Sequence, residues 1–463
     1  MPVRTSRIRP VQGSHRSVGS FRFAFQTMGG GYSMKKFIYL GLLALGVVLM
    51  VAPPVMAQEE KPFTIHGEVR YRGEYDTNTT DFDSNTHDTA MFWPYRVRIA
   101  AEGHFSKNVS AWIEIQNANT GGVAGPTRTG FGFDGSDVEL YQGNVTLDQL
   151  WSKNFSLRIG RQEIVAGNEL LLGDLDFYAG ITHDGGVGNW KLKKVNLMVW
   201  YSRPVENTVF GGNVSPDTLG IGAAPNPSTS VDFAGGYATW AFKKDQSFDV
   251  YLMDLSGRSV SSVQTVGARY AHDSTTKDGF IWDAELAQQF GDFNTTQKAK
   301  GRAIEGWFGY NWKKGRNVHR VYGRLESATG DKTSSTDYEG FVPMFGDFHN
   351  RTGRGDWFRL QDVSTGLGAS PGGGIVALSA GYNGFYNDRH EFGVAYWKYE
   401  LQEDNGAASK DLGKAFDVWY GFNYSRNVNF VVSLSQLNPD DALTGGGTND
   451  SVKRLYGQAR LRF

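Results

Sequence analysis

The last twelve residues of the chain, VKRLYGQARLRF, constrain its fold more than any other stretch. Successive side chains of a β-strand point to opposite faces, so this segment has one apolar face, which ends at Phe463, and one face that carries three arginines. Three arginines directed into the core of a soluble sheet would cost too much desolvation free energy. In a membrane barrel the apolar face meets lipid and the arginines meet a water-filled lumen. The segment therefore predicts a transmembrane barrel.

Period-two alternation recurs through the chain after residue 57, where no amphipathic helical segment of useful length appears. In residues 63–75, for example, Val69 and Tyr71 alternate with Arg70 and Arg72. Further alternating runs are 95–105, 155–159, 195–201, 416–424 and 430–434. The alternation is weaker at Gly173 to Gly188 and at Gln264 to His272. We expect an all-β, antiparallel transmembrane barrel of about 18 strands, with 16 as the alternative.

Short and long connections alternate between these runs. The long connections are Asp76 to Met91, Ala118 to Asp137, Pro204 to Ser230, Ala328 to Gly374 and Asn438 to Ser451. Outer-membrane barrels combine short periplasmic turns with long external loops, whereas a sandwich or a propeller has no reason to alternate the two. The sequence leaves open whether Ala328 to Gly374 folds inward as a plug, and it leaves the oligomeric state open.

The amino-terminal residues predict export. Residues 34–57 combine two lysines, an apolar run and a small-x-small ending, which is the pattern of a signal peptide, so the mature chain is expected to begin near Gln58. Residues 1–33 end in a glycine run directly before Met34 and are interpreted as a mis-annotated upstream extension. We expect one domain after them, the outer-membrane barrel of residues 58–463.

Composition and motifs exclude several classes of function. Without the seven basic residues of 1–57 the chain holds 40 basic and 48 acidic residues, a net charge of −8, so no nucleic-acid surface is indicated. The chain has no cysteine, no GxSxG nucleophile elbow between a strand and a helix, and no HExxH motif. We expect no enzyme, no catalytic residue, no cofactor and no metal site; the acid-rich residues 76–88 are interpreted as a solvated loop because they lack the glycine and terminal glutamate of a calcium loop.

Charged side chains on the inward parity are the candidate pore-lining residues. They are Arg70, Arg72, Arg96, Arg98, Arg158, Arg320, Arg324, Arg454, Arg460 and Arg462, together with the acids Glu68, Glu102 and Asp417. Arginine–carboxylate pairs could brace the wall, or unpaired arginines could form a constriction that selects anions. Because the two ends of the chain meet when the barrel closes and carry more arginines than acids, we expect that arc to be selective. Inward aromatics such as Trp200, Trp419 and Tyr456 could stack on sugar rings.

Two stretches carry a resemblance to a known family. Residues 157–163 (LRIGRQE), the pair Leu172-Gly173, the aromatics Phe177-Tyr178 and residues 182–186 resemble the alginate export family of bacterial outer-membrane porins. Residues 327–348, SATGDKTSSTDYEGFVPMFGDF, resemble a later loop of that family. The resemblance implies an 18-stranded monomeric barrel with an arginine-lined pore, and in the founding member the export of an anionic polysaccharide. The many inward acids depart from that pattern and put selectivity for uronates in doubt.

The sequence thus predicts an outer-membrane porin or export channel of a Gram-negative bacterium, which passes anionic or sugar-like solutes, a uronate polysaccharide among them. A second hypothesis is a scaffold barrel that sheathes a periplasmic partner, such as an electron-transfer conduit, or that supports surface adhesion. The expected partners are outer-membrane lipid, the anionic or sugar solute, and the barrel-assembly machinery, which recognises a terminal aromatic like Phe463. The solute itself and the direction of transport are not predicted.

Overall fold

The computed structural model describes residues 63–79, 81–121, 138–177, 179–205, 231–257, 260–273, 278–358, 373–407 and 409–463. These residues all belong to one unit of the chain, Lys61–Phe463. The predicted upstream extension and signal peptide lie outside them. So do most of two predicted loops, Ala118 to Asp137 and Pro204 to Ser230, and Tyr178 of the family motif.

Within these ranges the structure is one antiparallel sheet of eighteen strands, with one short helix. The strands are β1 (Phe63–Thr77), β2 (Ala90–Ser106), β3 (Val109–Gly121), β4 (Glu139–Asp148), β5 (Phe155–Gln162), β6 (His183–Lys191), β7 (Val195–Val205), β8 (Val231–Lys243), β9 (Gln246–Gly257), β10 (Val260–His272), β11 (Gly279–Asp292), β12 (Arg302–Lys314), β13 (Asn317–Thr329), β14 (Gly374–Tyr386), β15 (His390–Glu400), β16 (Asp411–Asn423), β17 (Val428–Pro439) and β18 (Val452–Arg462). The helix is α3 (Asp441–Thr444), between β17 and β18. No helix among the described residues is long and apolar enough to cross a membrane.

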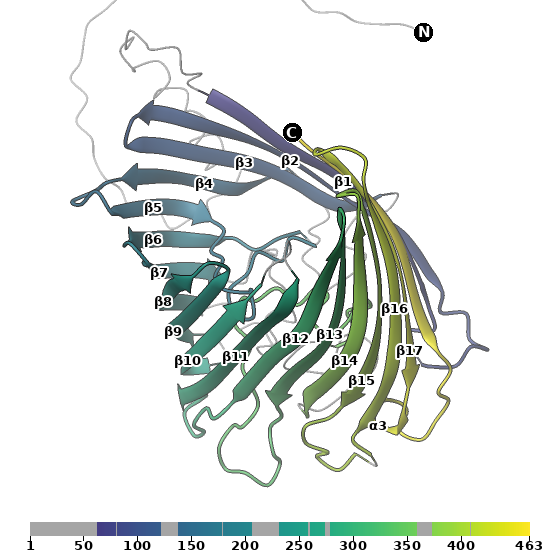
Figure 1. Ribbon diagram of the computed structural model, residues 1–463. Coiled ribbons are helices and arrows are strands. Elements are labelled where there is room, and N and C mark those ends of the chain that lie inside the picture. The colour runs from purple at the N-terminus through teal and green to yellow at the C-terminus, as the bar shows by residue number, and fades with distance from the viewer. Residues whose placement is uncertain are drawn as a thin grey trace, which may run out of the picture. The chain divides into compact units, whose positions relative to one another are not determined.

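The sheet closes on itself because β1 pairs with both β2 and β18 (Figure 1). The prediction of an all-β barrel is confirmed, with 18 strands rather than 16. Closure leaves no free sheet edge, as a spanning sheet requires. Short turns join β2 to β3, β12 to β13 and β14 to β15, and the longer connections lie at the other end. The expected alternation fails once, because only residues 258–259 separate β9 from β10 at the long-loop end.

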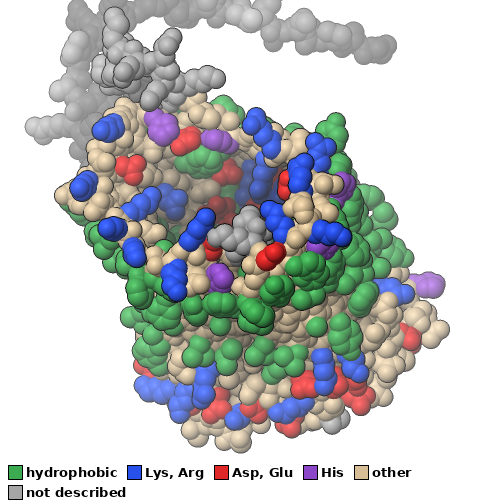
Figure 2. All heavy atoms as spheres, in the orientation of Figure 1, with side chains coloured by type: hydrophobic (Ala, Val, Ile, Leu, Met, Phe, Trp, Pro, Cys, Tyr) green, Lys and Arg blue, Asp and Glu red, His purple; other side chains and the backbone are tan. Residues whose placement is uncertain are grey.

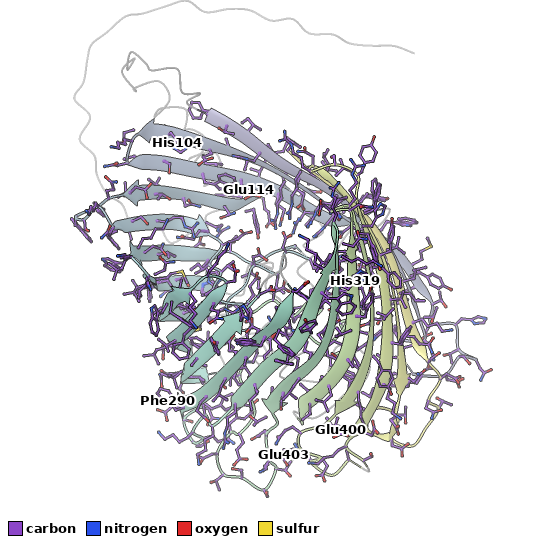
Figure 3. All side chains as sticks on the ribbon, in the orientation of Figure 1. His104, Glu114, Phe290, His319, Glu400 and Glu403 are labelled. Carbon is purple, nitrogen blue, oxygen red and sulfur yellow. The ribbon has the colours of Figure 1, made fainter. Side chains whose placement is uncertain are left out.

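Side chains alternate between the outside and the lumen along each strand. In β1 the Tyr71 side chain is 50% exposed, whereas the neighbouring Arg70 and Arg72 are 3% and 1% exposed. Figure 2 shows the result as a belt of hydrophobic side chains around the barrel, with charged side chains beyond the belt and inside the opening. In Figure 3, Phe290 lies on the outside and Glu114 points into the lumen. An apolar exterior and a polar interior are the pattern of a membrane barrel.

Two connections fold back into the lumen instead of staying outside. The first is residues 163–182, called the β5–β6 loop; the second is residues 330–358, called the β13–β14 segment. The expected strand at Gly173 to Gly188 is wrong in its first part, because β6 begins only at His183. The described part of the predicted Ala328 to Gly374 loop does contact inward side chains: Phe358 packs edge-on against Tyr399 of β15, with ring centroids 4.6 Å apart.

The two lumenal segments are joined to each other by backbone hydrogen bonds. Gly173 N–H donates to Phe345 O at 2.8 Å, and Phe345 N–H donates to Leu171 O at 3.0 Å. The Phe177 ring stacks on the His349 ring with centroids 3.3 Å apart. Leu172, Phe345 and other apolar side chains of both segments are buried in one cluster with inward residues of the wall. The lumen therefore has a packed core, which narrows it from within.

Candidate functional site

Five arginines from three adjacent strands form the candidate site at the barrel seam, and we call them the arginine arc. They are Arg70 of β1, Arg96 and Arg98 of β2, and Arg460 and Arg462 of β18. The strand register explains their grouping. Arg70 lies opposite Arg460 on one side and Arg96 on the other, whereas Glu68 lies between Arg462 and Arg98 in the next inward row. Closure of the barrel thus brings guanidinium groups from both ends of the chain together, as the sequence predicts.

A single loop residue, Asp176, meets all five arginines. Asp176, in the β5–β6 loop, accepts a hydrogen bond from Arg96 Nη2 on Oδ1 at 2.6 Å and from Arg462 Nη2 on Oδ2 at 3.1 Å. The Arg98 and Arg460 guanidinium nitrogens lie 3.4 and 3.6 Å from its carboxylate. Arg70 and Arg96 also donate to its backbone carbonyl oxygen. Asp176 therefore neutralises part of the positive charge of the arc.

The positive charges of the arc act strongly on the loop carboxylate. Burial raises the pKa of the Asp176 carboxyl, but the positive charges of Arg96, Arg98 and Arg70 outweigh it, so the pKa lies well below its usual range and the group is ionised. Glu68 accepts from Arg96 Nε at 2.9 Å and from Arg462 Nε at 3.0 Å. Glu163 and Glu114 lie 3.6 and 3.9 Å from Arg98, so four carboxylates contact the five cations. The expected arginine–carboxylate pairs are therefore present at the arc, and its role in selecting anions stays a prediction.

Two other predicted arginines of the seam hold the lumenal segments in place. Arg72 Nε lies 2.7 Å from Glu74, and its guanidinium covers the Phe177 ring at 3.7 Å from the centroid. Arg454 Nε lies 3.0 Å from Asp76, and its Nη1 donates to Gly355 O. Both side chains lie along the same seam as the arc. Arg72 contacts Phe177 of the β5–β6 loop, and Arg454 contacts Gly355 of the β13–β14 segment.

The remaining predicted residues on β13 and β16 are not brought to the arc. Arg324 is held between Glu305 at 2.9 Å and Glu326 at 2.5 Å. Arg320 lies 3.2 Å from Asp273. Asp417 accepts a hydrogen bond from the Arg354 backbone N–H at 2.9 Å. These three residues brace the wall or the β13–β14 segment.

The inward aromatics contact protein groups in this structure. Arg354 lies over the Trp419 ring at 4.2 Å, and Tyr456 meets Phe177 with ring centroids 5.5 Å apart. Trp200 packs against Phe233, also at 5.5 Å. All three predicted aromatics are directed inward and buried, so they support the lumenal segments.

Three carboxylates gather where the two lumenal segments meet. Glu169 and Asp174 of the β5–β6 loop and Asp347 of the β13–β14 segment have oxygen atoms within 4.8 Å of one another. Burial raises the pKa of Asp347 to about 7, and the charge of Glu169 adds to this shift. Burial also raises the pKa of Glu169 and of Asp174. Their mutual repulsion makes the contact between the two segments sensitive to protonation.

Comparison with known proteins identifies the family. A family model for alginate export matches residues 61–456. The chain belongs to the alginate export family. In the solved structures, Pseudomonas aeruginosa OccK1 (OpdK) matches with a TM-score of 0.57 at 13% identity, over 86% of this chain and 98% of that one. A structure of P. aeruginosa OpdK with vanillate gives a TM-score of 0.57, 13% identity and coverage of 86% and 99%. P. aeruginosa OccD3 (OpdP) matches with a TM-score of 0.55 at 10% identity, over 87% of this chain and 91% of that one.

The solved structures are too distant in sequence to show more than the fold, and a comparison with curated proteins finds no significant match. Membership of the alginate export family, together with the closed barrel, confirms the predicted resemblance. It identifies the protein as a channel of the bacterial outer membrane, with lipid around its apolar belt.

The sequence did not predict a role for Asp176, which contacts all five arginines of the arc in this alginate export family member. Asp176 lies in a stretch that the sequence analysis assigned to a weak strand, so parity gave it no role. A signal was present in its surroundings: Leu170 to Leu172 is a run of three leucines beside a loop. In the β13–β14 segment, Phe341, Phe345 and Trp357 are equally out of place in a solvated loop. Apolar side chains in long connections indicate segments that fold into the lumen.

Proposed function

We propose that this outer-membrane channel passes small anionic or sugar-like solutes, and that the arginine arc selects for carboxylates. The observation that carries the proposal is the position of Asp176, whose carboxylate meets four guanidinium groups and whose carbonyl oxygen meets the fifth. Arginine presents a planar fork of donors that matches a carboxylate, and charge-assisted hydrogen bonds of this kind are stronger than neutral ones. A solute carboxylate in the same place would find the same donors.

The lumenal segments force a passing solute close to the arc. The β5–β6 loop and the β13–β14 segment fill part of the lumen and join through the Phe177–His349 stack. A narrow, charged passage concentrates counter-ions and raises their rate of entry. Vanillate, named in the structure of the related-fold OpdK, is also a carboxylate. A uronate polysaccharide carries one carboxylate on each sugar, so transport of such a chain fits the arc once the two segments move aside.

The scaffold hypothesis finds less support. A barrel that sheathes a periplasmic partner needs an open lumen to receive it. Here the apolar cluster around Leu172 and Phe345 occupies that space.

We further propose that residues 34–57 act as a cleaved signal peptide and that Met34 is the true start. The assembly signal would be Phe463, whose ring is 55% exposed on the lipid-facing row and whose backbone pairs with Gly67 through hydrogen bonds of 2.9 and 3.0 Å. Amino-terminal sequencing of the protein from outer membranes should begin near Gln58. A start within residues 1–33 would contradict this part of the proposal.

Reversal potentials in planar bilayers test the proposed selectivity. Under a salt gradient the wild-type channel should select anions, and the combined variant Arg70→Gln, Arg96→Gln, Arg460→Gln should lose most of that selectivity. Arg316→Gln is the matched control, because this arginine is 69% exposed and pairs with Asp388 in a turn. A wild-type channel that selects cations would refute the proposal, whether or not the combined variant folds.

A further inference from the structure

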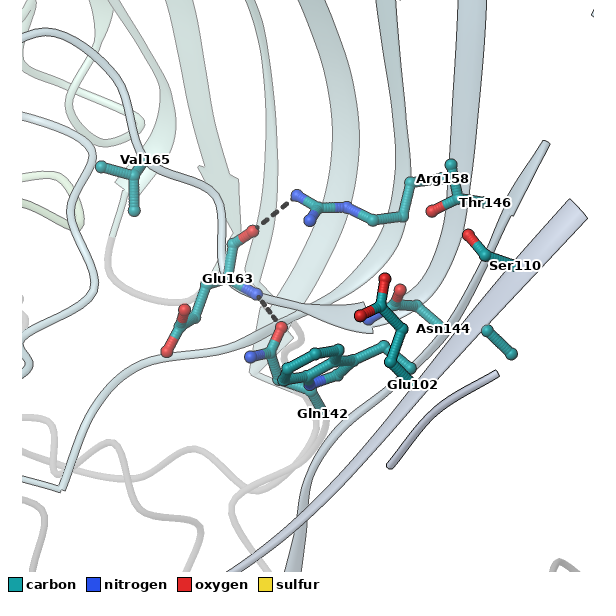
Figure 4. A pocket seen from close by; sticks show the side chains of 10 residues that line it. Glu102, Ser110, Gln142, Asn144, Thr146, Arg158, Glu163 and Val165 are labelled. Atoms are coloured by element: carbon teal, nitrogen blue, oxygen red, sulfur yellow. Dashed lines mark hydrogen bonds between the residues drawn. The ribbon is translucent and has the colours of Figure 1, made fainter. Parts of the chain in front are cut away.

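A cavity of about 440 Å³ lies in the lumen wall at β2 to β5, apart from the contacts of Asp176 (Figure 4). Its size falls within the range of small-molecule sites. The residues that matter for its chemistry are Glu102 of β2, Ser110 and Trp112 of β3, Asn144 and Thr146 of β4, and Arg158 of β5.

The strand register places these side chains in two neighbouring rows. Ser110, Thr146 and Arg158 lie opposite one another in one row. Glu102, Trp112 and Asn144 form the next row, which ends at Gly160. Gly160 has a φ of +125°, and a Cβ atom there would lie 2.3 Å from Gly143 O, so the position requires glycine and carries no side chain. Arg158 and Glu102 thus approach the cavity from strands that are three positions apart.

Arg158 brings a positive charge that the Glu163 carboxylate attracts without a direct ion pair. Its Nε donates to Gln162 Oε1, and its Nη2 donates to the Glu163 backbone oxygen at 2.9 Å. Among the described residues it forms no ion pair. Figure 4 shows the Glu163 carboxylate pointing away from the guanidinium. That carboxylate instead accepts from Tyr141 Oη at 2.6 Å and lies 3.6 Å from Arg98.

Glu102 brings a negative charge that lacks an arginine or lysine partner within the described residues. Its neighbours are imidazoles, with His66 Nε2 at 3.3 Å and His104 Nε2 at 3.2 Å. Figure 4 shows its carboxylate projecting into the cavity. The hydroxyl groups of Ser110 and Thr146 have no hydrogen-bond partner among the same residues. The cavity wall also includes the polar side chains of Gln142 and Asn144, the indole of Trp112 and a second acid, Glu163.

We propose that this cavity binds a small zwitterion, with its carboxylate on Arg158 and its ammonium group on Glu102. A simple carboxylate at Arg158 would meet the unneutralised Glu102, and a simple amine at Glu102 would meet Arg158. A ligand with both charges can form a charge-assisted hydrogen bond with each group, and Glu102, whose side chain is 34% exposed, remains accessible to it. The hydroxyls of Ser110 and Thr146 can bind the carboxylate alongside Arg158. The Trp112 ring can contact the carbon chain or the cation.

Three matched probes test the charge pattern. γ-Aminobutyrate carries both charges, butyrate carries only the carboxylate, and butylamine carries only the ammonium group. Binding to the full mature chain in detergent micelles is measured by calorimetry. We expect γ-aminobutyrate to bind at least about ten-fold more tightly than either single-charge probe, because each lost charged hydrogen bond is worth about 1.5–3 kcal/mol. Equal affinity for butyrate, or no binding of γ-aminobutyrate, would overturn the proposal.

Two variants should reverse the preference in opposite directions. Glu102→Gln removes the repulsion of lone carboxylates, so butyrate should gain affinity while γ-aminobutyrate loses it. Arg158→Gln removes the repulsion of lone ammonium groups, so butylamine should gain affinity while γ-aminobutyrate loses it. A folding defect would weaken all three probes together, so it cannot imitate this reversal. Unchanged preferences in both variants would refute the assignment. Arg316→Gln, far along the wall in a turn, should bind all three probes as the wild type does.

The proposal does not rest on transport. Binding in micelles is measured without a membrane, and neither Glu102 nor Arg158 contacts Asp176. A wild-type channel that selects cations would refute the proposed selectivity but not this binding site. Absence of γ-aminobutyrate binding would refute this site but not the proposed selectivity.

Discussion

Opposite walls of the barrel use the same residue types in opposite proportions. At the seam, one inward row consists of three arginines, Arg460, Arg70 and Arg96. Nine strands further round, an inward row reads Asp249, Arg269, Glu285, with one arginine between two acids. Arg269 lies 2.9 Å from Asp249 and 2.5 Å from Asp283 of β11.

The difference shows two uses of inward charge. On the opposite wall the arginine is satisfied by neighbouring strands, which are fixed, so the charges brace the barrel. At the seam the arginines share Asp176, which belongs to a loop, in addition to Glu68 of β1 and Glu114 of β3. Under the proposed function, the charge that a loop neutralises is the part that a solute can use.

Asp176→Asn should have the largest effect on the channel. The substitution removes an ionised acceptor from contacts with four guanidinium groups, each worth about 1.5–3 kcal/mol, so the docked loop should lose at least about ten-fold in population. Single-channel conductance should rise and selectivity for anions should increase. Asp83→Asn, in an exposed loop, is the control and should leave both values unchanged. Conductance equal to the wild type would show that the loop is held by other contacts.

Arg269→Gln should destabilise the barrel more than it alters selectivity. It leaves Asp249 and Asp283 buried without their cation, and breaking a buried pair costs about 3–5 kcal/mol. Arg460→Gln should cost less, because this side chain is 28% exposed and its contact with Asp176 is 3.6 Å long. Unfolding temperatures in detergent compare the two variants. A larger loss for Arg460→Gln would reverse the assignment of bracing and binding walls.

Rising pH should loosen the contact between the two lumenal segments. The pKa of Asp347 is raised from 3.8 to about 7 by burial, so the folded contact favours the protonated acid. Its stability is therefore complete at acid pH and is lost as the pH rises towards about 7. The facing charges are Glu169 and Asp174, which raise the proton affinity further, and Arg351, which opposes them. Conductance should increase over this range, and Asp347→Asn should abolish the increase.

Arg161→Gln should have the smallest effect, although Arg161 belongs to the GRQ motif of the family resemblance. It faces outward and its Nη2 lies 2.6 Å from Asp184 of the adjacent strand, with both side chains more than a third exposed. Exposed pairs contribute about 0–1 kcal/mol. Neither conductance nor reversal potential should change. A change in selectivity would mean that the outward row influences the lumen.

Parity in the sequence predicted the barrel, the seam and the direction of all ten named arginines, because alternation is local and closure follows from the membrane. Parity could not tell Arg454, which Asp76 holds, from Arg460, which meets a loop acid. That distinction depends on where the β5–β6 loop travels, and the path of a loop is set by distant packing, here of Leu172 against Phe345. Arg158 was directed inward correctly, but its lack of a direct ion pair depends on the path of Glu163.

Competition between a free carboxylate and Asp176 tests the central claim most directly. The measurement is the concentration of acetate that half-saturates the change in ion current, for the wild type and for Asp176→Asn in the same bilayer. If the arginine arc is a carboxylate site occupied by the channel's own loop, the half-saturating acetate concentration of the variant should be at least about ten-fold lower than that of the wild type. Equal half-saturation in both proteins would contradict the claim, because Asp176 would then not compete for the arc.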